Sequence, residues 1–154
     1  MSADRINFHA TAIVIDETGM LFVGPSGSGK SELAFSFLTE AQRCGLPAAL
    51  VADDQVLMSS QDGHVLVERP ESIAGLLELR GSGIVELQSV KSATIDYAIT
   101  PVAHSQSPRL PPENEWLDLP TGNRLPLIRI PLSSITPYGK FAALAQNLFK
   151  AKGK

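Results

Sequence analysis

Apolar residues occur along the chain in short runs that alternate with turn-forming residues, and this pattern predicts a mixed α/β protein. Extended apolar segments predict strands over residues 6–15, 20–23, 48–52, 56–60, 64–68, 84–87, 94–103 and 125–130. Apolar positions at helical spacing predict helices over residues 31–40 and 138–152, and a short one over residues 70–77. Strands interleaved with helices favour a layered fold built around one central sheet.

Local sequence features refine this outline. The segment 48–52 is apolar at every position, as expected for a central strand that is buried on both faces. The stretch from Pro101 to Pro137 contains eight of the eleven prolines and is expected to be rich in loops. The apolar side of the last helix could pack on its own sheet or against a second copy of the chain; it consists of Phe141, Leu144, Ala145, Leu148 and Phe149.

Composition narrows the class of protein. A length of 154 residues predicts one domain, spanning 1–154, with a proper core. The net charge of −3 and the absence of a basic stripe argue against a nucleic-acid partner. The single cysteine, Cys44, cannot form an internal disulfide, and we expect it to pack as a small apolar residue in a reducing compartment. Because no apolar run reaches membrane-spanning length and no signal-like core is present, we expect a cytoplasmic protein without a membrane partner.

The most specific signal is a phosphate-binding loop. Residues 24 to 31 read Gly-Pro-Ser-Gly-Ser-Gly-Lys-Ser and fill every fixed position of the G-x-x-x-x-G-K-[ST] motif. A strand precedes the loop and a helix follows it, which disfavours the alternative of a Gly/Ser-rich turn that binds nothing. The predicted nucleotide-binding residues are Gly24, Pro25, Ser26, Gly27, Ser28, Gly29, Lys30 and Ser31. Lys30 suits the terminal phosphates and Ser31 suits Mg²⁺, so ATP and Mg²⁺ are the expected cofactors.

Two adjacent carboxylates follow the central strand. Asp53 and Asp54 come directly after the apolar segment that ends at Ala52. Ligands of open α/β sheets bind at the carboxyl edge of the strands, where this pair is expected. One carboxylate there can hold Mg²⁺ while the other accepts a proton from an attacking hydroxyl. The alternative is a solvated turn, and the nearby phosphate loop favours the functional interpretation.

Three further residues carry weaker signals. Glu78 and Arg80 flank Leu79, so they share one face of an extended segment. A glutamate near Mg²⁺ and an arginine near a transferring phosphoryl group are chemically sensible, although an exposed ion pair would explain them equally. His9, on a mixed strand, is by spacing alone more typical of a half-buried structural residue.

Together these motifs resemble the catalytic domain of HPr kinase/phosphorylase. The resemblance rests on His9, the loop 24–31, the Val-Ala-Asp-Asp of residues 51–54, and residues 77–84, Leu-Glu-Leu-Arg-Gly-Ser-Gly-Ile. The last segment is similar to the family's Leu-Glu-Ile-Arg-Gly-Leu-Gly-Ile. The resemblance to this family implies an α/β fold with a P-loop-containing central mixed β-sheet flanked by helices. Such a fold is a phosphoenolpyruvate-carboxykinase-like variant of the P-loop kinase core.

The resemblance also implies a reaction and residue roles. Members phosphorylate a serine of HPr, the phosphocarrier of the sugar phosphotransferase system, in an ATP- and Mg²⁺-dependent reaction. By this resemblance Asp54 is the proton acceptor, Lys30 contacts the β- and γ-phosphates, and His9 lies close to Asp54. Ser31 and Glu78 are implied to hold Mg²⁺ with Asp53 nearby, and Arg80 lies in a loop implied to matter for catalysis. Arg109 is the candidate for the family's active-site arginine, and relatives assemble as hexamers.

Some alternatives stay open at this stage. The family also removes the phosphate from HPr with inorganic phosphate, and the sequence does not decide whether this chain does so. A P-loop kinase for a small metabolite is a second hypothesis, disfavoured because no arginine-rich lid segment is recognisable. A nucleotide-sensing module without turnover is a third, disfavoured because a sensor has no need of a proton acceptor.

Overall fold

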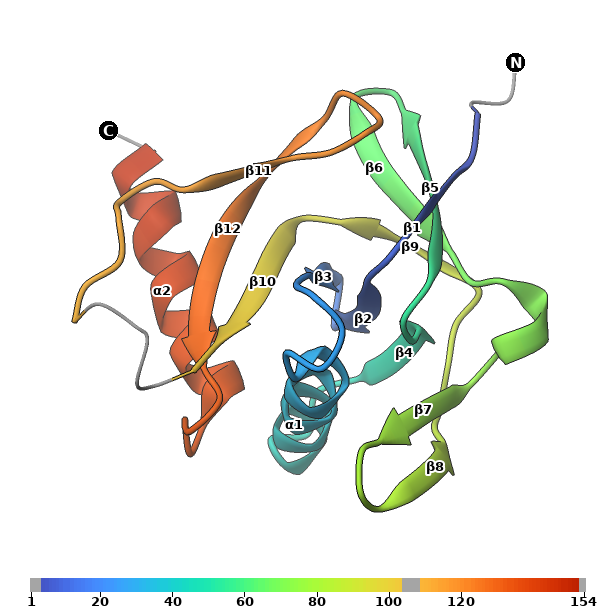
Figure 1. Cartoon of the computed structure of the whole chain (residues 1–154). Helices are drawn as coiled ribbons and strands as arrows, with labels where there is room; N and C mark the ends of the chain where they lie inside the picture. Colours follow the sequence, from blue (N-terminus) through green and yellow to red (C-terminus); the bar gives the residue numbers. More distant parts are fainter. Residues whose placement is uncertain (1–3, 104–108, 153–154) are drawn as a thin grey trace.

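The computed structural model describes residues 4–103 and 109–152. Twelve named strands and two α-helices occupy these ranges (Figure 1). The elements are β1 (Ile6–Phe8), β2 (Thr11–Ile15), β3 (Thr18–Phe22), α1 (Lys30–Arg43), β4 (Ala48–Ala52), β5 (Val56–Gln61), β6 (His64–Glu68), β7 (Leu76–Leu79), β8 (Gly83–Glu86), β9 (Ser92–Ile95), β10 (Tyr97–Val102), β11 (Trp116–Asp118), β12 (Arg124–Pro131) and α2 (Pro137–Lys152). The mixed α/β class expected from the sequence is confirmed.

A six-stranded mixed sheet forms the centre, in the order β11-β12-β10-β3-β2-β4. β3 pairs in parallel with β10, and β10 in parallel with β12, whereas β2 lies antiparallel between β3 and β4. The parallel strands β3, β10 and β12 therefore end at the same edge of the sheet. The phosphate loop leaves β3 at that edge, which is where ligands of α/β sheets bind.

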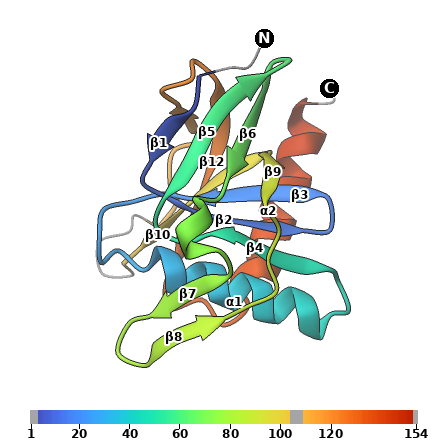
Figure 2. The ribbon, with the colours of Figure 1, turned by 90° about the vertical axis from the view of Figure 1, so that its right-hand side faces the viewer.

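Two apolar cores lie on opposite faces of this sheet. On one face α1 and α2 pack through residues such as Leu33, Phe37 and Phe141. The rings of Phe22 and Phe37 meet edge to face with centroids 5.0 Å apart, a favourable aromatic geometry. On the other face lies a four-stranded antiparallel sheet, β1-β5-β6-β9, which shares the second core. Figure 2 shows this sheet and α1 on opposite sides of the strands β2 to β4.

Two predicted strands are each divided in the structure. The segment 6–15 forms β1 and β2, which belong to different sheets, and His9 lies at the crossing between them. The segment 94–103 forms β9 and β10, separated by Asp96. The carboxylate of Asp96 accepts a hydrogen bond from the backbone N–H of Gly19 at 3.0 Å, which anchors this crossing. In both cases the chain passes from one sheet to the other at a polar residue, His9 or Asp96, whose side chain contacts a distant part of the sequence.

The helix predicted over residues 70–77 is wrong. The structure has a single 3-10 turn at Glu71–Ile73, followed by the strand β7. Gly75 lies between them with a φ of 77°, a left-handed conformation that ends helical winding. β7 pairs with β8 in a separate hairpin, and Leu77 of β7 is fully buried in the core with the helices. Cys44, which we expected to pack, is exposed at the end of α1.

Candidate active site

The phosphate loop has the backbone geometry of an anion cradle. Gly24, Gly27 and Gly29 take φ values of 146°, 81° and 101°, which only glycine adopts readily. Gly29 is the N-cap of α1, so the free N–H groups of the first helical turn point toward the loop. A Cβ atom on Gly29 would lie 2.7 Å from the end of the Leu132 side chain, which would have to move aside, so the positive φ is the stronger reason for glycine at this position.

Lys30 lies beneath the loop. Its side chain is 6% exposed, and its Nζ donates hydrogen bonds to the carbonyl oxygens of Gly24 at 2.9 Å and Pro25 at 3.1 Å. Burial lowers the pKa of Lys30 from its ordinary value, and the negative charges of Asp54 and Asp53 partly offset that shift. Lys30 therefore places one buried positive charge beside the two carboxylates, directly under the phosphate loop.

Asp53 is a meeting point of three segments of the chain. Its Oδ1 accepts hydrogen bonds from the hydroxyls of Ser31 at 2.6 Å and Thr11 at 2.9 Å, and its Oδ2 accepts one from the backbone N–H of Glu78 at 3.1 Å. These contacts tie β4, α1, β2 and β7 together. Thr11 is a residue that sequence reasoning missed. The available signal was a polar side chain within an otherwise apolar strand, which must find a partner when buried.

Asp54 faces solvent at the same place. Its side chain is 64% exposed, and its backbone has a φ of 73° because the strand β4 ends at Ala52. The backbone N–H of Asp54 donates to the hydroxyl of Thr11 at 3.2 Å, and its carbonyl accepts from the N–H of Ala10 at 3.1 Å. The left-handed turn allows the carboxylates of Asp53 and Asp54 to face one cavity, which two successive residues of a regular strand could not do.

His9 lies between the buried lysine and the exposed aspartate. Its Nε2 is 3.2 Å from the Nζ of Lys30, and its Nδ1 is 3.3 Å from the Oδ1 of Asp54. A lysine ammonium can only donate, so with a charged Lys30 the Nε2 is the acceptor and the hydrogen of a neutral ring is on Nδ1. That hydrogen then faces the carboxylate of Asp54. His9 is therefore in contact with both residues, through the two nitrogens of its ring.

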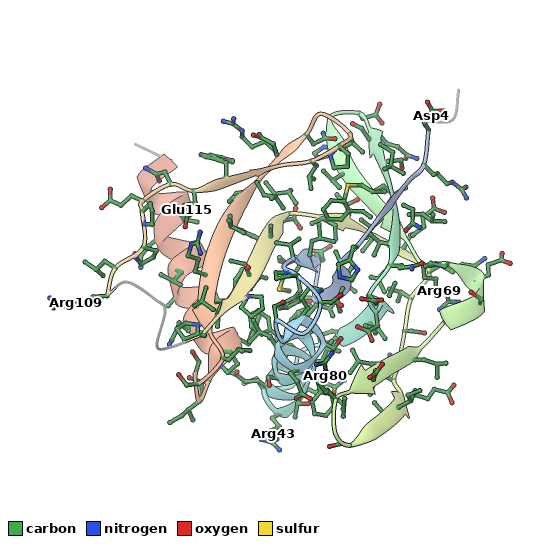
Figure 3. The ribbon with its side chains drawn as sticks, in the orientation of Figure 1. Asp4, Arg43, Arg69, Arg80, Arg109 and Glu115 are labelled. Atoms are coloured by element: carbon green, nitrogen blue, oxygen red, sulfur yellow. The ribbon has the colours of Figure 1, made fainter. Side chains whose placement is uncertain are left out.

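These residues surround one cavity of about 280 Å³. It is lined by Ser26, Gly27, Gly29, Lys30, Ser31, Glu32, Asp53, Asp54, Glu78 and Arg80. Glu78 and Arg80 come from β7 and the turn after it, and the guanidinium of Arg80 lies over Gly27, 3.5 Å from where a Cβ would be. Figure 3 shows Arg80 beside α1 near the loop. The structure thus brings together most of the site residues expected from the sequence.

Arg109 is the exception among the expected site residues. It lines a second cavity together with Pro25, Gly27 and Ser28, on the other side of the phosphate loop. Figure 3 shows Arg109 and Arg80 on opposite sides of the loop. Arg109 is therefore not among the residues that line the cavity with the carboxylates, and it lines the cavity on the α2 side of the loop instead.

The donor atoms of the first cavity suit a magnesium ion. The hydroxyl oxygen of Ser31 and the carboxylate oxygen of Asp53 lie 2.6 Å apart, and the Glu78 carboxylate lines the same cavity. Oxygen is the donor that Mg²⁺ prefers. In residues 4–103 and 109–152, no group of three His, Cys, Asp or Glu side chains could hold a metal unaided. An ion bound through one or two carboxylates, with phosphate oxygens and water completing the shell, fits such a site.

Neither helix in the described part of the chain has the length and apolar character needed to cross a membrane.

Comparison with known proteins gives a consistent result. The family model of the HPr Serine kinase C-terminal domain matches residues 1–96. HPr kinase/phosphorylase of Pediococcus pentosaceus is 36% identical over 93 residues, which are 60% of this chain and 28% of that protein. HPr kinase/phosphorylase of Streptococcus thermophilus is 33% identical over 143 residues, 86% of this chain and 44% of that protein. The chain therefore spans less than half the length of these relatives.

A solved structure, the Hpr(Ser) kinase/phosphatase from Coxiella burnetii, superposes with a TM-score of 0.74. The match covers 97% of this chain and 99% of that chain at 22% sequence identity. A likeness at this identity establishes the shared fold, including the central mixed sheet and its helices.

Proposed function

The chain belongs to the HPr serine kinase C-terminal domain family, and on this premise we propose that it transfers the γ-phosphoryl group of ATP to a serine of HPr or an HPr-like phosphocarrier protein. The observation that carries the proposal is the position of Asp54. Its exposed carboxylate lines the same cavity as Lys30 and Ser31 of the phosphate loop. A proton acceptor beside a triphosphate cradle is what transfer to an alcohol requires.

Binding of ATP rests on the loop and its lysine. The backbone N–H groups of a glycine-rich loop and the N-terminus of α1 supply a positive field for the β- and γ-phosphates. Lys30 now bonds to the carbonyls of Gly24 and Pro25, and a bound phosphate would offer its ammonium a charged partner instead. Ser31, Asp53 and Glu78 would hold Mg²⁺, whose contribution is to neutralise the charge on the phosphate oxygens.

The transfer step uses the residues around Asp54. The serine hydroxyl oxygen forms a bond to the γ-phosphorus while the bond from that phosphorus to the bridging oxygen of ADP breaks. The hydroxyl proton passes to the Asp54 carboxylate, which is more accessible than Asp53, because Asp53 already accepts three hydrogen bonds. Arg80, with its guanidinium over Gly27, is placed to offset the charge that develops on the transferred group.

His9 acts in this proposal as a positioning residue. Its Nδ1 contact at 3.3 Å orients the Asp54 carboxylate, and its Nε2 contact at 3.2 Å connects that carboxylate to Lys30. When phosphate draws the ammonium of Lys30 away, the Nε2 contact is lost, while the Nδ1 contact continues to hold the Asp54 carboxylate toward the cavity.

The proposal extends to the finer features expected from the sequence. We take residues 1–154 as one catalytic-type domain with a phosphoenolpyruvate-carboxykinase-like P-loop core. Assembly as a homo-oligomer, a hexamer by resemblance, is part of the same proposal. The isoleucine at position 135 is 96% exposed, an apolar surface that a second copy could cover.

The test is transfer of labelled γ-phosphate from ATP to purified bacterial HPr, comparing wild type with Asp54→Asn. We expect the variant to lose about 10²–10⁴-fold in transfer rate, the range for removing a general base, with ATP affinity nearly unchanged. Asp62→Asn is the matched control, because Asp62 also has a positive φ, 54°, but lies in the β5–β6 turn away from the cavity.

Three outcomes would contradict parts of this proposal. An Asp54→Asn variant as fast as wild type would remove Asp54 as the proton acceptor. A wild type that binds ATP but phosphorylates neither HPr nor a panel of metabolite alcohols would instead be a nucleotide-sensing module. Phosphorylation of a metabolite alone would indicate a small-molecule kinase. The same assay run backward, with phosphorylated HPr and inorganic phosphate, tests the reverse reaction.

A further inference from the structure

A second cavity of about 660 Å³ adjoins the phosphate loop on the side of α2. Its walls come from the loop itself, from the ends of β10 and β12, and from α2. Figure 1 shows the ends of β10 and β12 to the left of α1, where α2 lies, whereas β7 lies to the right of α1. Gly27 lines both cavities, so they meet across the loop. A volume of this size falls within the range of roughly 300–1,000 Å³ that is usual for small-ligand sites.

We propose that this second cavity holds the nucleoside half of the nucleotide whose phosphates occupy the first. The inference rests on the proposed function and adds the site of the base and ribose. A nucleoside triphosphate is longer than the phosphate cradle, so its base must leave the loop on one side. On the β7 side stand Asp53 and Asp54, where the accepting hydroxyl has to enter. The base and ribose can therefore leave the loop on the side of α2.

The walls of the second cavity match a nucleoside in chemistry. Apolar surface comes from Val102, Pro131, Leu132 and Leu144, and no Asp or Glu side chain is among the residues that line the cavity. Such surfaces accept the flat faces of a purine base. The absence of lining carboxylates also spares the α-phosphate from like-charge repulsion.

Three cationic side chains add a preference for an anionic, aromatic ligand. Arg129 is already paired with Glu115 at 2.7 Å, and Lys140 donates to the hydroxyl of Ser134 at 2.9 Å. Arg109, which lines the same cavity, has an exposed side chain that can stack on a base or contact the α-phosphate. In this proposal Arg109, which the resemblance made the candidate active-site arginine, contacts the nucleoside and not the residues around Asp54.

Ser28 supplies an independent observation. Its Oγ atom is buried and has no hydrogen-bond partner among the described residues, although the side chain lines the second cavity. Buried hydroxyls without partners are rare in folded proteins, because desolvation without a hydrogen bond is unfavourable. A turn of the Ser28 side chain toward the cavity would let that hydroxyl bond to a ribose hydroxyl or an α-phosphate oxygen.

Calorimetric titration with two probes separates the nucleoside from the phosphates. Mg²⁺–ATP and Mg²⁺–tripolyphosphate share a phosphate chain, and only ATP carries a nucleoside. Leu144→Trp fills the second cavity from an exposed position on α2, and we expect ATP to bind about tenfold more weakly or worse, with tripolyphosphate changed less than about twofold. Ala142→Trp, on the same helix but outside the cavity lining, is the matched control and should bind both probes as wild type does.

A second variant and a photolabelling experiment keep the test valid if one of the variants misfolds. Val102→Phe fills the same cavity from β10 and should repeat the selective loss of ATP binding. In wild type, photolabelling with 8-azido-ATP should modify peptides that contain Val102 or Leu144, and excess ATP should prevent it.

The outcomes are distinguishable. If wild type binds both probes equally and neither cavity-filling variant changes ATP affinity, the nucleoside lies elsewhere and the proposed kinase function survives. The same conclusion follows if 8-azido-ATP labels the β7–β8 hairpin instead. If wild type binds neither probe, the proposed function itself fails, and the second cavity loses its assignment with it.

Discussion

The hydroxyl of Thr11 donates a 2.9 Å hydrogen bond to the carboxylate of Asp53 from the neighbouring strand of the central sheet. The same hydroxyl accepts a hydrogen bond from the backbone N–H of Asp54 at 3.2 Å. A single buried side chain therefore holds the carboxylate of Asp53 and the backbone of Asp54. Because Thr11 is fully buried, water cannot replace it in either contact.

Replacing Thr11 should affect both the stability of the fold and the rate of transfer to HPr. Thr11→Val keeps the shape but removes the hydroxyl, and we expect a loss of about 0.5–1.5 kcal/mol in unfolding free energy, because Asp53 loses one of its three hydrogen bonds and the backbone N–H of Asp54 loses its partner. Transfer to HPr should fall as well. Thr11→Ser retains the hydroxyl and should keep most of the activity. Chemical denaturation and the transfer assay check both, and equal activity of the valine and serine variants would contradict the role given to the hydroxyl.

Asp53 should set the magnesium requirement. Asp53→Asn replaces one accepting oxygen by an amide donor, so we expect the Mg²⁺ concentration for half-maximal transfer to rise by about tenfold or more. Titration of the transfer rate with Mg²⁺ measures this. Asp96→Asn makes the same change at an aspartate that bonds to the backbone of Gly19. It should lower the melting temperature and leave the magnesium requirement unchanged.

Gly29 and Gly45 form a matched pair. Both have positive φ values, 101° and 81°, but a Cβ on Gly29 would meet Leu132 at 2.7 Å, whereas one on Gly45 would meet nothing within 4 Å. Gly45→Ala should therefore lose about 1 kcal/mol in stability through backbone strain alone. Gly29→Ala should lose more and also weaken ATP binding, because its φ lies further from the left-handed region that other residues tolerate and the Leu132 side chain has to move. Equal losses in both variants would show that the clash with Leu132 is relieved freely.

Glu40 caps the second helix from the first. Its two carboxylate oxygens accept hydrogen bonds from the backbone N–H groups of Tyr138 at 2.9 Å and Gly139 at 2.8 Å. A carboxylate at a helix N-terminus stabilises the free N–H groups and the dipole, so Glu40→Ala should lower the unfolding free energy by about 1–2 kcal/mol. Glu17→Ala, at an exposed turn residue, should change it little. Urea denaturation compares the two variants.

The ion pair between Glu115 and Arg129 should make stability depend on pH. Hydrogen bonding from Arg129 lowers the pKa of Glu115 below its ordinary value of 4.5, and burial only partly opposes this. A lowered pKa in the folded state means that the pair stabilises the protein above pH 4.5 and that this contribution is lost as the pH falls below it. Wild type should thus exceed Glu115→Gln by about 1 kcal/mol near pH 7, a modest value because Arg129 is 37% exposed.

The control for that prediction is a second arginine–carboxylate pair. Asp118 and Arg124 meet at 3.0 Å with side chains that are 79% and 58% exposed. An exposed pair of this kind contributes little, so Asp118→Asn should follow the wild-type stability at every pH. A pH-independent difference between wild type and Glu115→Gln would place the effect in packing and not in the charge.

Local sequence was sufficient for the parts of the site whose conformation is local. The glycines of residues 24–31 determine the loop, because only glycine adopts its positive φ values without strain. The continuous apolar run 48–52 correctly predicted a strand that is buried at every residue, with the two aspartates after its end, but β4 is the last strand of the six-stranded sheet and not a central one. The misassigned helix at residues 70–77 shows the limit of such reasoning, since one left-handed glycine at position 75 outweighed the apolar spacing.

Only the tertiary structure decided which distant residues meet. The contact of His9 with both Lys30 and Asp54, the link from Asp53 to the backbone of Glu78, and the separation of Arg109 from the carboxylates all follow from strand pairing between β2, β3, β4 and β10. Pairing of strands far apart in the chain depends on which apolar faces can be buried together, and no local pattern encodes that choice. Composition and motif therefore determined what chemistry is present, while packing of the two cores determined on which side of the loop each group stands.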